Sequence, residues 1–201
     1  MINSLNKIAI IILAAGASKR MGSIKQLLPW KNTSLLGNAI EQALNSNADD
    51  IFVVLGSNYG LISEEINEHD ITIVNNKNWA LGMGTSIAEA MEIIKNNSKK
   101  YRAVLILLVD QPLIDVKYIN ILIDSFVGNN IIASGYQNRV GVPAIFDHKY
   151  FNELKKLNGD IGARKLILEH INDVKIINGL DKLKDIDTIE SYGQLYQKFG
   201  K

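Results

Sequence analysis

The chain has 201 residues, of which 47% are hydrophobic and 21% charged, and its formal net charge is +1. This length fits one large domain, residues 1–201, with enough apolar material for a substantial core. The small net charge excludes a global field that would favour nucleic acid or an anionic membrane. Cysteine is absent from the sequence, which excludes disulfides and thiolate chemistry and is compatible with the cytosol.

Targeting and membrane signals are also missing from the pattern. The segment Met1–Lys7 is too short and polar for a signal peptide. The longest apolar runs, Ile8–Gly16 and Ala103–Val109, are far shorter than the ~20 residues of a membrane helix. We therefore expect a cytoplasmic protein that binds neither membrane nor nucleic acid.

The stretch from Leu13 to Lys25 carries the strongest functional signal. It follows a short apolar run of β-branched residues, Ile8–Leu13, which predicts a buried strand. Gly16 and Gly22 can adopt positive φ and let backbone N–H groups converge. Lys19, Arg20 and Lys25 add positive charge, and such a basic nest of amides favours an anion. We predict a phosphate site at the carboxyl edge of a parallel sheet.

Two common phosphate motifs do not fit this loop. A P-loop needs Ser or Thr after its lysine, but Gln26 follows Lys25. A dinucleotide-binding loop needs an acid at the end of the second strand, and the strand Ile51–Leu55 is followed by Gly56-Ser57-Asn58. A Rossmann-type oxidoreductase stays open on fold alone, and the missing acid counts against it.

Strands and helices alternate in the following part of the chain. A helix with Asn32 or Thr33 as its N-cap is predicted next, because apolar residues recur at helical spacing at Leu35, Leu36, Ala39, Ile40, Ala43 and Leu44. The strand Ile51–Leu55, a short helix over Leu61–Asn67 and the strand Ile71–Val74 come next. This alternation predicts right-handed βαβ units and a mostly parallel sheet.

A second glycine-bearing loop, Asn75–Gly84, leads into a further helix. Ser86 and Glu89 have the spacing of a capping box. The free N–H groups of this helix start would point towards whatever the first loop binds.

The strand Ala103–Val109 is apolar on both faces, as in the centre of a parallel sheet. It ends in Asp110-Gln111-Pro112. Asp115 is better placed to cap the helix that runs to Phe126, which leaves Asp110 available for another role.

The remaining elements are shorter. Ile131–Ser134 and Val174–Ile177 are predicted strands, and Pro143 makes the run Gly141–Phe146 an edge or irregular strand. Asp160 is the expected N-cap of a helix near Arg164. Asp187 is the expected cap of a C-terminal helix that ends near Tyr196.

The string Leu13–Lys25 resembles LAxGxSxRMGxxK, the signature loop of the MobA/MocA-like nucleotidyltransferases. Further motifs follow in family order over nearly the whole chain: GMGTS from Gly82, DQP from Asp110, GVPAIF from Gly141, GDIGAR from Gly159 and DIDT from Asp185. LAAG together with LLP is similar to the MocA-type branch, the molybdenum cofactor cytidylyltransferases. The resemblance implies a Rossmann-like three-layer α/β sandwich of the nucleotide-diphospho-sugar transferase type.

The resemblance also implies roles for individual residues. Nucleotide binding is implied for Leu13, Ala14, Ala15, Gly16, Ser18, Arg20, Met21, Gly22, Lys25, Gly82 and Ser86. Acceptor binding is implied for Met83, Thr85, Pro143 and Arg164. Catalytic roles are implied for Arg20, Lys25 and Asp110. Asp110 would hold Mg²⁺, and Asp187 or Asp185 would supply a second ligand.

The activity implied is Mg²⁺-dependent transfer of CMP from CTP to the terminal phosphate of molybdopterin, with release of pyrophosphate. A client molybdoenzyme is a further implied partner. Other nucleobases and other phosphorylated acceptors stay open at this point. So does a non-catalytic protein that hands molybdopterin to an enzyme, although such a protein would not need both Lys25 and Asp110.

Overall fold

The computed structural model describes residues 7–97, 100–128, 130–179 and 181–201. Its central sheet contains β1 (Lys7–Leu13), β4 (Asp50–Leu55), β5 (Thr72–Asn75), β6 (Tyr101–Leu108), β7 (Ile131–Gly135), β8 (Val140–Asp147) and β9 (Val174–Asn178). A separate hairpin pairs β2 (Pro29–Trp30) with β3 (Thr33–Ser34). The helices are α1 (Leu35–Leu44), α2 (Tyr59–Glu65), α3 (Met83–Asn96), α4 (Val116–Ser125), α5 (Phe151–Leu154), α6 (Ala163–Glu169) and α7 (Ile189–Phe199).

The sheet is mostly parallel, as the alternation of strands and helices predicts. Its strand order is β5-β4-β1-β6-β8-β7-β9. β1 pairs in parallel with β4 and β6, and β7 pairs in parallel with β9. β8 is antiparallel to both β6 and β7. The carboxyl ends of β1 and β6 therefore meet at one edge of the sheet, next to the point where the direction changes.

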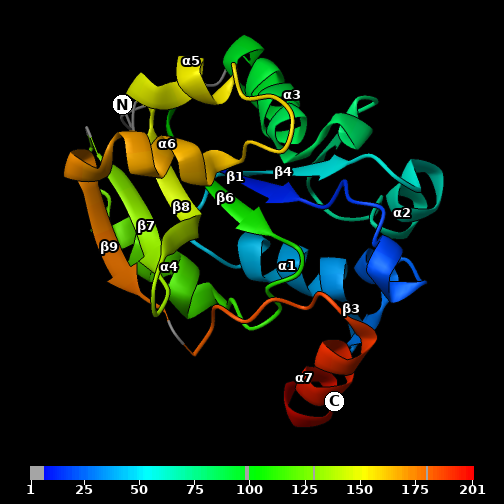
Figure 1. Ribbon diagram of the computed structural model, residues 1–201. Helices are drawn as coiled ribbons and strands as arrows, with labels where there is room; N and C mark the ends of the chain where they lie inside the picture. The colour runs from blue at the N-terminus through cyan, green and yellow to red at the C-terminus, as the bar shows by residue number, and fades with distance from the viewer. Residues whose placement is uncertain (1–6, 98–99, 129, 180) are drawn as a thin grey trace.

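Helices cover both faces of the sheet, which gives a three-layer sandwich (Figure 1). On β1, Ile8, Ile10 and Ile12 face a core that contains residues of α1, α2 and α4. Ala9, Ile11 and Leu13 face a second core that contains residues of α3, α5 and α6. The apolar run of β1 is continuous because successive side chains enter opposite layers, both of which exclude water.

The sequence predicts the N-cap of α4 correctly but not that of α1. Asp115 caps α4 as expected, since its carboxylate accepts a hydrogen bond from the N–H of Tyr118 at 2.9 Å. For α1 the expected cap was wrong: Ser34, not Asn32 or Thr33, accepts the bond from Gly37 N. The hairpin β2–β3 occupies Thr33 and moves the start of the helix.

Three other expected caps were also wrong. α3 begins at Met83 after Gly82, so Ser86 lies inside the helix, where its hydroxyl accepts a hydrogen bond from Asn76 instead. α6 begins after Gly162 without a side-chain cap, so Asp160 does not cap it. α7 is capped by Thr188, which follows Asp187.

The strand that contains Pro143 is interior but irregular, so of the two expected alternatives the edge strand was wrong and the irregular strand is confirmed. β8 lies between β6 and β7. Ala133 pairs with Ala144, whereas Ser134 pairs with Gly141. The shift in register leaves Pro143 in a bulge, where the missing N–H costs no ladder hydrogen bond.

The C-terminal helix packs on the small hairpin (Figure 1). Trp30 is fully buried, and its ring meets Tyr196 edge to face, with the centroids 6.4 Å apart. Tyr192 donates a hydrogen bond to the carbonyl of Pro29 at 2.8 Å. These contacts fix the segment that precedes α7, which passes along the edge where β1 and β6 end.

Within the described residues, no helix is both long and apolar enough to cross a membrane. The longest of them, α3, has 14 residues, compared with the ~20 that a bilayer needs. Residues 1–6, for which the sequence predicts no signal peptide, lie outside the described part.

Replacing Ile106 by Ala tests the central position of β6. Ile106 is fully buried, and the cavity left by the substitution is expected to lower the free energy of unfolding by about 3 kcal/mol. Leu44, which is 38% exposed at the end of α1, is the control, and its replacement by Ala is expected to cost less than about 1 kcal/mol. Urea unfolding measures both. Equal losses would contradict the assigned core.

Candidate active site

A cavity of about 620 Å³ opens at the carboxyl ends of β1 and β6. The loop after β1 forms much of its wall. The first residues of α3 and the residues that follow β6 also contribute to it. The lining residues are Leu13, Ala14, Ala15, Gly16, Ala17, Ser18, Lys19, Arg20, Met21, Lys25, Gln26, Trp79, Ala80, Gly82, Met83, Ser86, Leu108, Val109, Asp110, Asp160 and Asp187. The volume lies in the range of small-molecule sites.

The loop after β1 turns sharply around two left-handed residues. Ser18 has φ 52° and Gly22 has φ 63°, on either side of the 3₁₀ turn Lys19–Met21. Met21 is buried with Trp30 and anchors this turn. Lys19 and Arg20 remain exposed at the rim of the cavity.

Lys25 connects three segments of the site. Its ammonium donates to Asp110 Oδ2 at 2.9 Å and to the carbonyl of Ile186 at 3.1 Å. Ile186 N–H in turn donates to the backbone carbonyl of Asp110 at 2.8 Å. The loop after β1, the end of β6 and the segment before α7 are thus bound to one another through one cation.

The surroundings of Asp110 make its negative charge costly. Burial raises the pKa of the Asp110 carboxyl above its ordinary value; Lys25 opposes this rise, and the carboxylates of Asp185 and Asp187 add to it. A cation near these carboxylates would relieve their mutual repulsion.

Asp110 and Asp187 fit a divalent cation. Both line the large cavity, and Asp110 Oδ1 is buried without a hydrogen-bond partner among the described residues. Carboxylate oxygens are the ligands that Mg²⁺ prefers, together with substrate phosphates and water. The described residues contain no group of three or more His, Cys, Asp or Glu that could hold a metal, so phosphate oxygens and water would complete the shell.

Asp185 is held away from the large cavity by other partners. Its carboxylate accepts hydrogen bonds from Gln111 Nε2 at 2.8 Å and from Arg139 at 3.3 Å. Gln111 Nε2 also donates to the hydroxyl of Tyr136 at 2.7 Å. Of the two acids in the DIDT segment, Asp187 is therefore the one that shares a cavity with Asp110.

The second glycine loop packs directly on the loop before α6. A Cβ on Gly82 would lie 2.3 Å from the carbonyl carbon of Gly159, and a Cβ on Gly84 would lie 2.6 Å from the carbonyl oxygen of Ile161. Gly84 N–H donates to Gly159 O at 2.9 Å. Glycine is required at both positions because the two backbones touch.

Asn76 stabilises the same loop through its side-chain amide. It is fully buried, and its Nδ2 donates to the hydroxyls of Thr85 and Ser86, each at 2.9 Å. The Thr85 hydroxyl lies within hydrogen-bond distance of the carbonyls of Asn78 and Gly82. Thr85 therefore holds the loop together.

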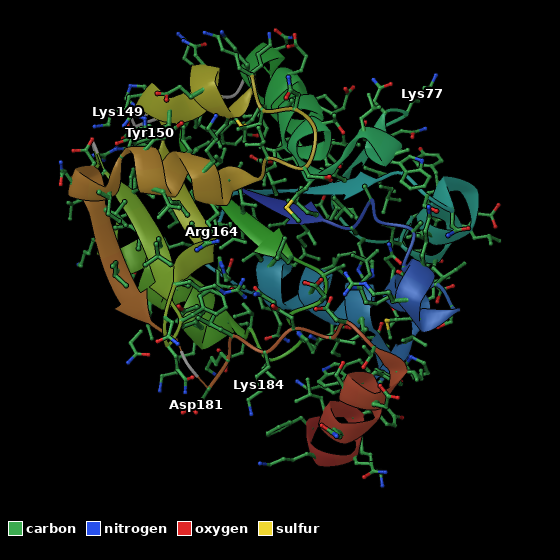
Figure 2. The ribbon with its side chains drawn as sticks, viewed as in Figure 1. Lys77, Lys149, Tyr150, Arg164, Asp181 and Lys184 are labelled. Carbon is green, nitrogen blue, oxygen red and sulfur yellow. The ribbon has the colours of Figure 1, made fainter. Side chains whose placement is uncertain are left out.

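A second cavity of about 160 Å³ adjoins the first. Leu13, Met83 and Leu108 line both cavities and separate them. The remaining wall is formed by Ile87, Ile106, Gln111, Tyr136, Arg139, Val140, Gly141, Val142, Gly162, Ala163, Arg164 and Asp185. Figure 2 labels Arg164, whose side chain extends from α6 towards the sheet.

Hydrogen bonding and stacking hold the polar side chains of the second cavity in place. Burial raises the pKa of Tyr136 to about 12, so the phenol stays protonated at neutral pH and donates to Val142 O. Arg139 stacks on the Tyr136 ring at 4.4 Å. The cavity therefore combines apolar walls with two guanidinium groups, those of Arg139 and Arg164.

The structure brings most of the predicted site residues together. All the residues predicted to bind nucleotide line the large cavity except Gly22, which turns the loop. Met83 lies between the two cavities, and Arg164 lines the second. Thr85 and Pro143, predicted to contact the acceptor, line neither cavity; Pro143 is buried, and its carbonyl accepts a hydrogen bond from Ser134.

Several residues of the site escaped the sequence reasoning. Gln26 and Asn76 are buried amides that hold the two loops, and Gln111, Tyr136 and Arg139 form the wall of the second cavity. Gln26 lies between the charged Lys25 and the apolar residues Leu27 and Leu28, so no local pattern marks its side chain as buried. The other side chains meet only in the folded chain.

This arrangement of a parallel sheet, a basic loop and a facing carboxylate is that of a nucleotidyltransferase. The MobA-like NTP transferase domain matches residues 10–174. The chain belongs to this family.

Relatives in the family differ in their named activities. The chain is 30% identical to the nicotine blue oxidoreductase of Paenarthrobacter nicotinovorans, with 93% of this chain and 94% of the relative covered. It is 30% identical to the purine catabolism protein PucB of Bacillus subtilis, with 90% and 92% covered. It is 34% identical to the molybdenum cofactor cytidylyltransferase of Escherichia coli over 91 residues, 45% and 47% of the two chains.

Solved structures agree with the fold. A homologue of Rv0371c from Mycobacterium sp. strain JC1 superposes with a TM-score of 0.82 at 28% identity, covering 96% of both chains. Rv0371c of Mycobacterium tuberculosis in complex with manganese gives 0.80 at 26% identity, covering 96% of this chain and all of the other.

Replacing Gly82 by Ala tests the contact between the two loops. Gly82 has φ 116°, and the added methyl would meet the backbone of Gly159 and Asp160. We expect the free energy of unfolding to fall by about 2 kcal/mol. Gly60→Ala is the matched control, since a Cβ there meets nothing within 4 Å. Indistinguishable unfolding curves for the two variants would rule out the tight contact.

Proposed function

We propose that this protein transfers CMP from CTP to the terminal phosphate of molybdopterin and releases pyrophosphate. The observation that carries the proposal is the ion pair between Lys25 and Asp110, which lines one cavity together with an amide-rich basic loop. The family and the molybdenum cofactor cytidylyltransferase of Escherichia coli support the reaction class and the acceptor.

The reaction would be an in-line displacement at the α-phosphorus. An oxygen of the acceptor phosphate forms a bond to this phosphorus, and the bond from the α-phosphorus to the bridging oxygen of the β-phosphate breaks. The electron pair leaves with pyrophosphate. The attacking phosphate is already ionised at neutral pH, so no general base is needed. Most of the acceleration would come from alignment and charge neutralisation.

The chain's own residues supply the positive field for this step. Arg20 and Lys19 at the rim and Lys25 inside would hold the β- and γ-phosphates together with the loop amides. Asp110 and Asp187 would hold Mg²⁺, which supplies charge neutralisation at the α-phosphate when it is bound. The manganese complex of Rv0371c is consistent with a divalent cation in such proteins.

The second cavity is the proposed site of the acceptor. Its walls are mainly apolar, with Arg139 and Arg164 among the lining residues. This chemistry suits an acceptor with a flat ring system and an anionic group. Leu13, Met83 and Leu108 line both this cavity and the large one, so an acceptor phosphate could reach the α-phosphate there.

A second candidate function is oxidoreduction, which the identity to nicotine blue oxidoreductase favours. A redox cofactor with a nucleotide moiety would then occupy the large cavity. Asp110 facing Lys25 weighs against this alternative, because hydride transfer does not need a carboxylate beside the phosphate site.

The direct test is pyrophosphate release with molybdopterin and each of CTP, GTP, ATP and UTP in turn. Release with CTP that depends on both molybdopterin and Mg²⁺ supports the proposal. Release with another nucleotide changes the assigned base. Failure to release pyrophosphate from any nucleotide with molybdopterin would reject molybdopterin as the acceptor.

Replacing Lys25 or Asp110 by Ala is expected to lower turnover by about 100-fold or more, since each removes a charged contact to the reacting phosphates. Lys117 and Asp124 are exposed on α4 and provide matched Lys→Ala and Asp→Ala controls. Pyrophosphate release measures all four variants. Near wild-type turnover of Asp110→Ala would remove the metal assignment.

Ligand-dependent thermal unfolding distinguishes the two candidate functions. With Mg²⁺ and CTP at about 100 times the dissociation constant, we expect the midpoint to rise by about 5–10 °C. NADPH and FAD test the oxidoreductase alternative and should produce no comparable rise in the unfolding midpoint. A rise with either of them and none with any nucleoside triphosphate would favour the oxidoreductase.

A further inference from the structure

Gln26 is a buried amide placed directly behind the phosphate loop. The residue is 2% exposed, although glutamine is usually a surface residue. Its Nε2 donates to the carbonyl oxygens of Ala14 at 2.7 Å and of Gly16 at 2.8 Å. Both amide hydrogens are therefore used on the backbone of one loop.

The remaining partners fix the orientation of this amide. Carbonyl oxygens only accept hydrogen bonds, so the nitrogen of Gln26 must face Ala14 and Gly16. Gln26 Oε1 accepts from the hydroxyl of Ser18 at 3.3 Å. The same hydroxyl accepts from the N–H of Lys25 at 3.3 Å. The amide thus also ties Ser18, whose φ is 52°, to the start of the Lys25 turn.

Pinning these carbonyls determines where the adjacent N–H groups point. In a trans peptide the C=O and the following N–H are antiparallel, and the cis peptide found in the described residues is Val142–Pro143. Since Gln26 holds the carbonyls of Ala14 and Gly16, the N–H groups of Ala15 and Ala17 point away from it. Ala15 and Ala17 line the large cavity, and neither N–H has a backbone acceptor among the described residues.

We infer that Gln26 is a positioning residue, which holds the amides of Ala15 and Ala17 towards the phosphate chain of the nucleotide. This inference rests on the proposed function, since it assigns an anion to the large cavity. Lys25 and Arg20 supply net charge, whereas Gln26 supplies the direction of the uncharged donors. A loop organised before binding loses less conformational entropy when the phosphate arrives.

Two substitutions test the role. Gln26→Glu keeps the shape of the side chain but places a carboxylate oxygen against the two carbonyl oxygens. Gln26→Met keeps the length of the side chain but removes its hydrogen-bond donors. We expect both variants to bind inorganic tripolyphosphate at least about tenfold more weakly in calorimetry. Gln197→Glu, an exposed position on α7, makes the same chemical change elsewhere and should bind as tightly as the wild type.

Steady-state kinetics distinguishes positioning from general loss of structure. In the proposed reaction, the KM for the nucleotide should rise at least about tenfold in Gln26→Met, while the KM for the acceptor stays as in the wild type. Equal increases in both KM values, or unchanged tripolyphosphate binding, would overturn the inference and leave the proposed function intact. A wild type that binds neither tripolyphosphate nor any nucleotide would overturn both.

Amide NMR on the wild type decides the question if neither variant folds. Addition of tripolyphosphate should shift the N–H resonances of Ala15 and Ala17 more than those of the surrounding strand residues. Shifts confined to Arg20 and Lys25 would show that the cations alone hold the anion, and the role of Gln26 would fall.

Discussion

The ion pair between Lys25 and Asp110 is the interaction on which the site depends. The two residues are 85 positions apart in the sequence, yet their side chains are 2.9 Å apart. They meet because β1 and β6 are parallel neighbours whose loops leave the same edge of the sheet. In the free protein each charge neutralises the other. A bound triphosphate would offer Lys25 new partners and leave Asp110 to a cation, so the ligand's charges would replace the internal pair.

The two cavities lie side by side because the ends of the same two strands line both of them. Leu13 ends β1 and Leu108 ends β6, and together with Met83 they line both the large cavity and the second cavity, the proposed nucleotide and acceptor sites. These three apolar side chains lie where the two phosphates of the proposed reaction would meet. The fold thus provides alignment through strand order and charge through the loops.

The sequence predicts the sheet and the first loop well because both depend on local patterns. The apolar run Ile8–Leu13 and the glycines of the next segment carry their own signals, and the structure confirms the strand. The misses have a different origin. Pro143 is tolerated in an interior strand because the pairing of β7 with β8 shifts register at this position and leaves a bulge, and Ser86 bonds to Asn76 instead of capping α3. The network of Gln111, Tyr136 and Asp185 joins three distant segments, which no local pattern encodes.

The contact between the loop at Gly82–Gly84 and the loop at residues 158–161 limits how this fold can diversify. Backbone lies on backbone there, so a larger side chain on either side requires the other loop to retreat. A chimera that takes residues 79–86 from a relative must therefore take residues 157–164 from the same relative. The loop after β1 has no such backbone contact at Gly16 or Gly22, where a Cβ would meet nothing within 4 Å. The two loops should therefore change together, as a pair.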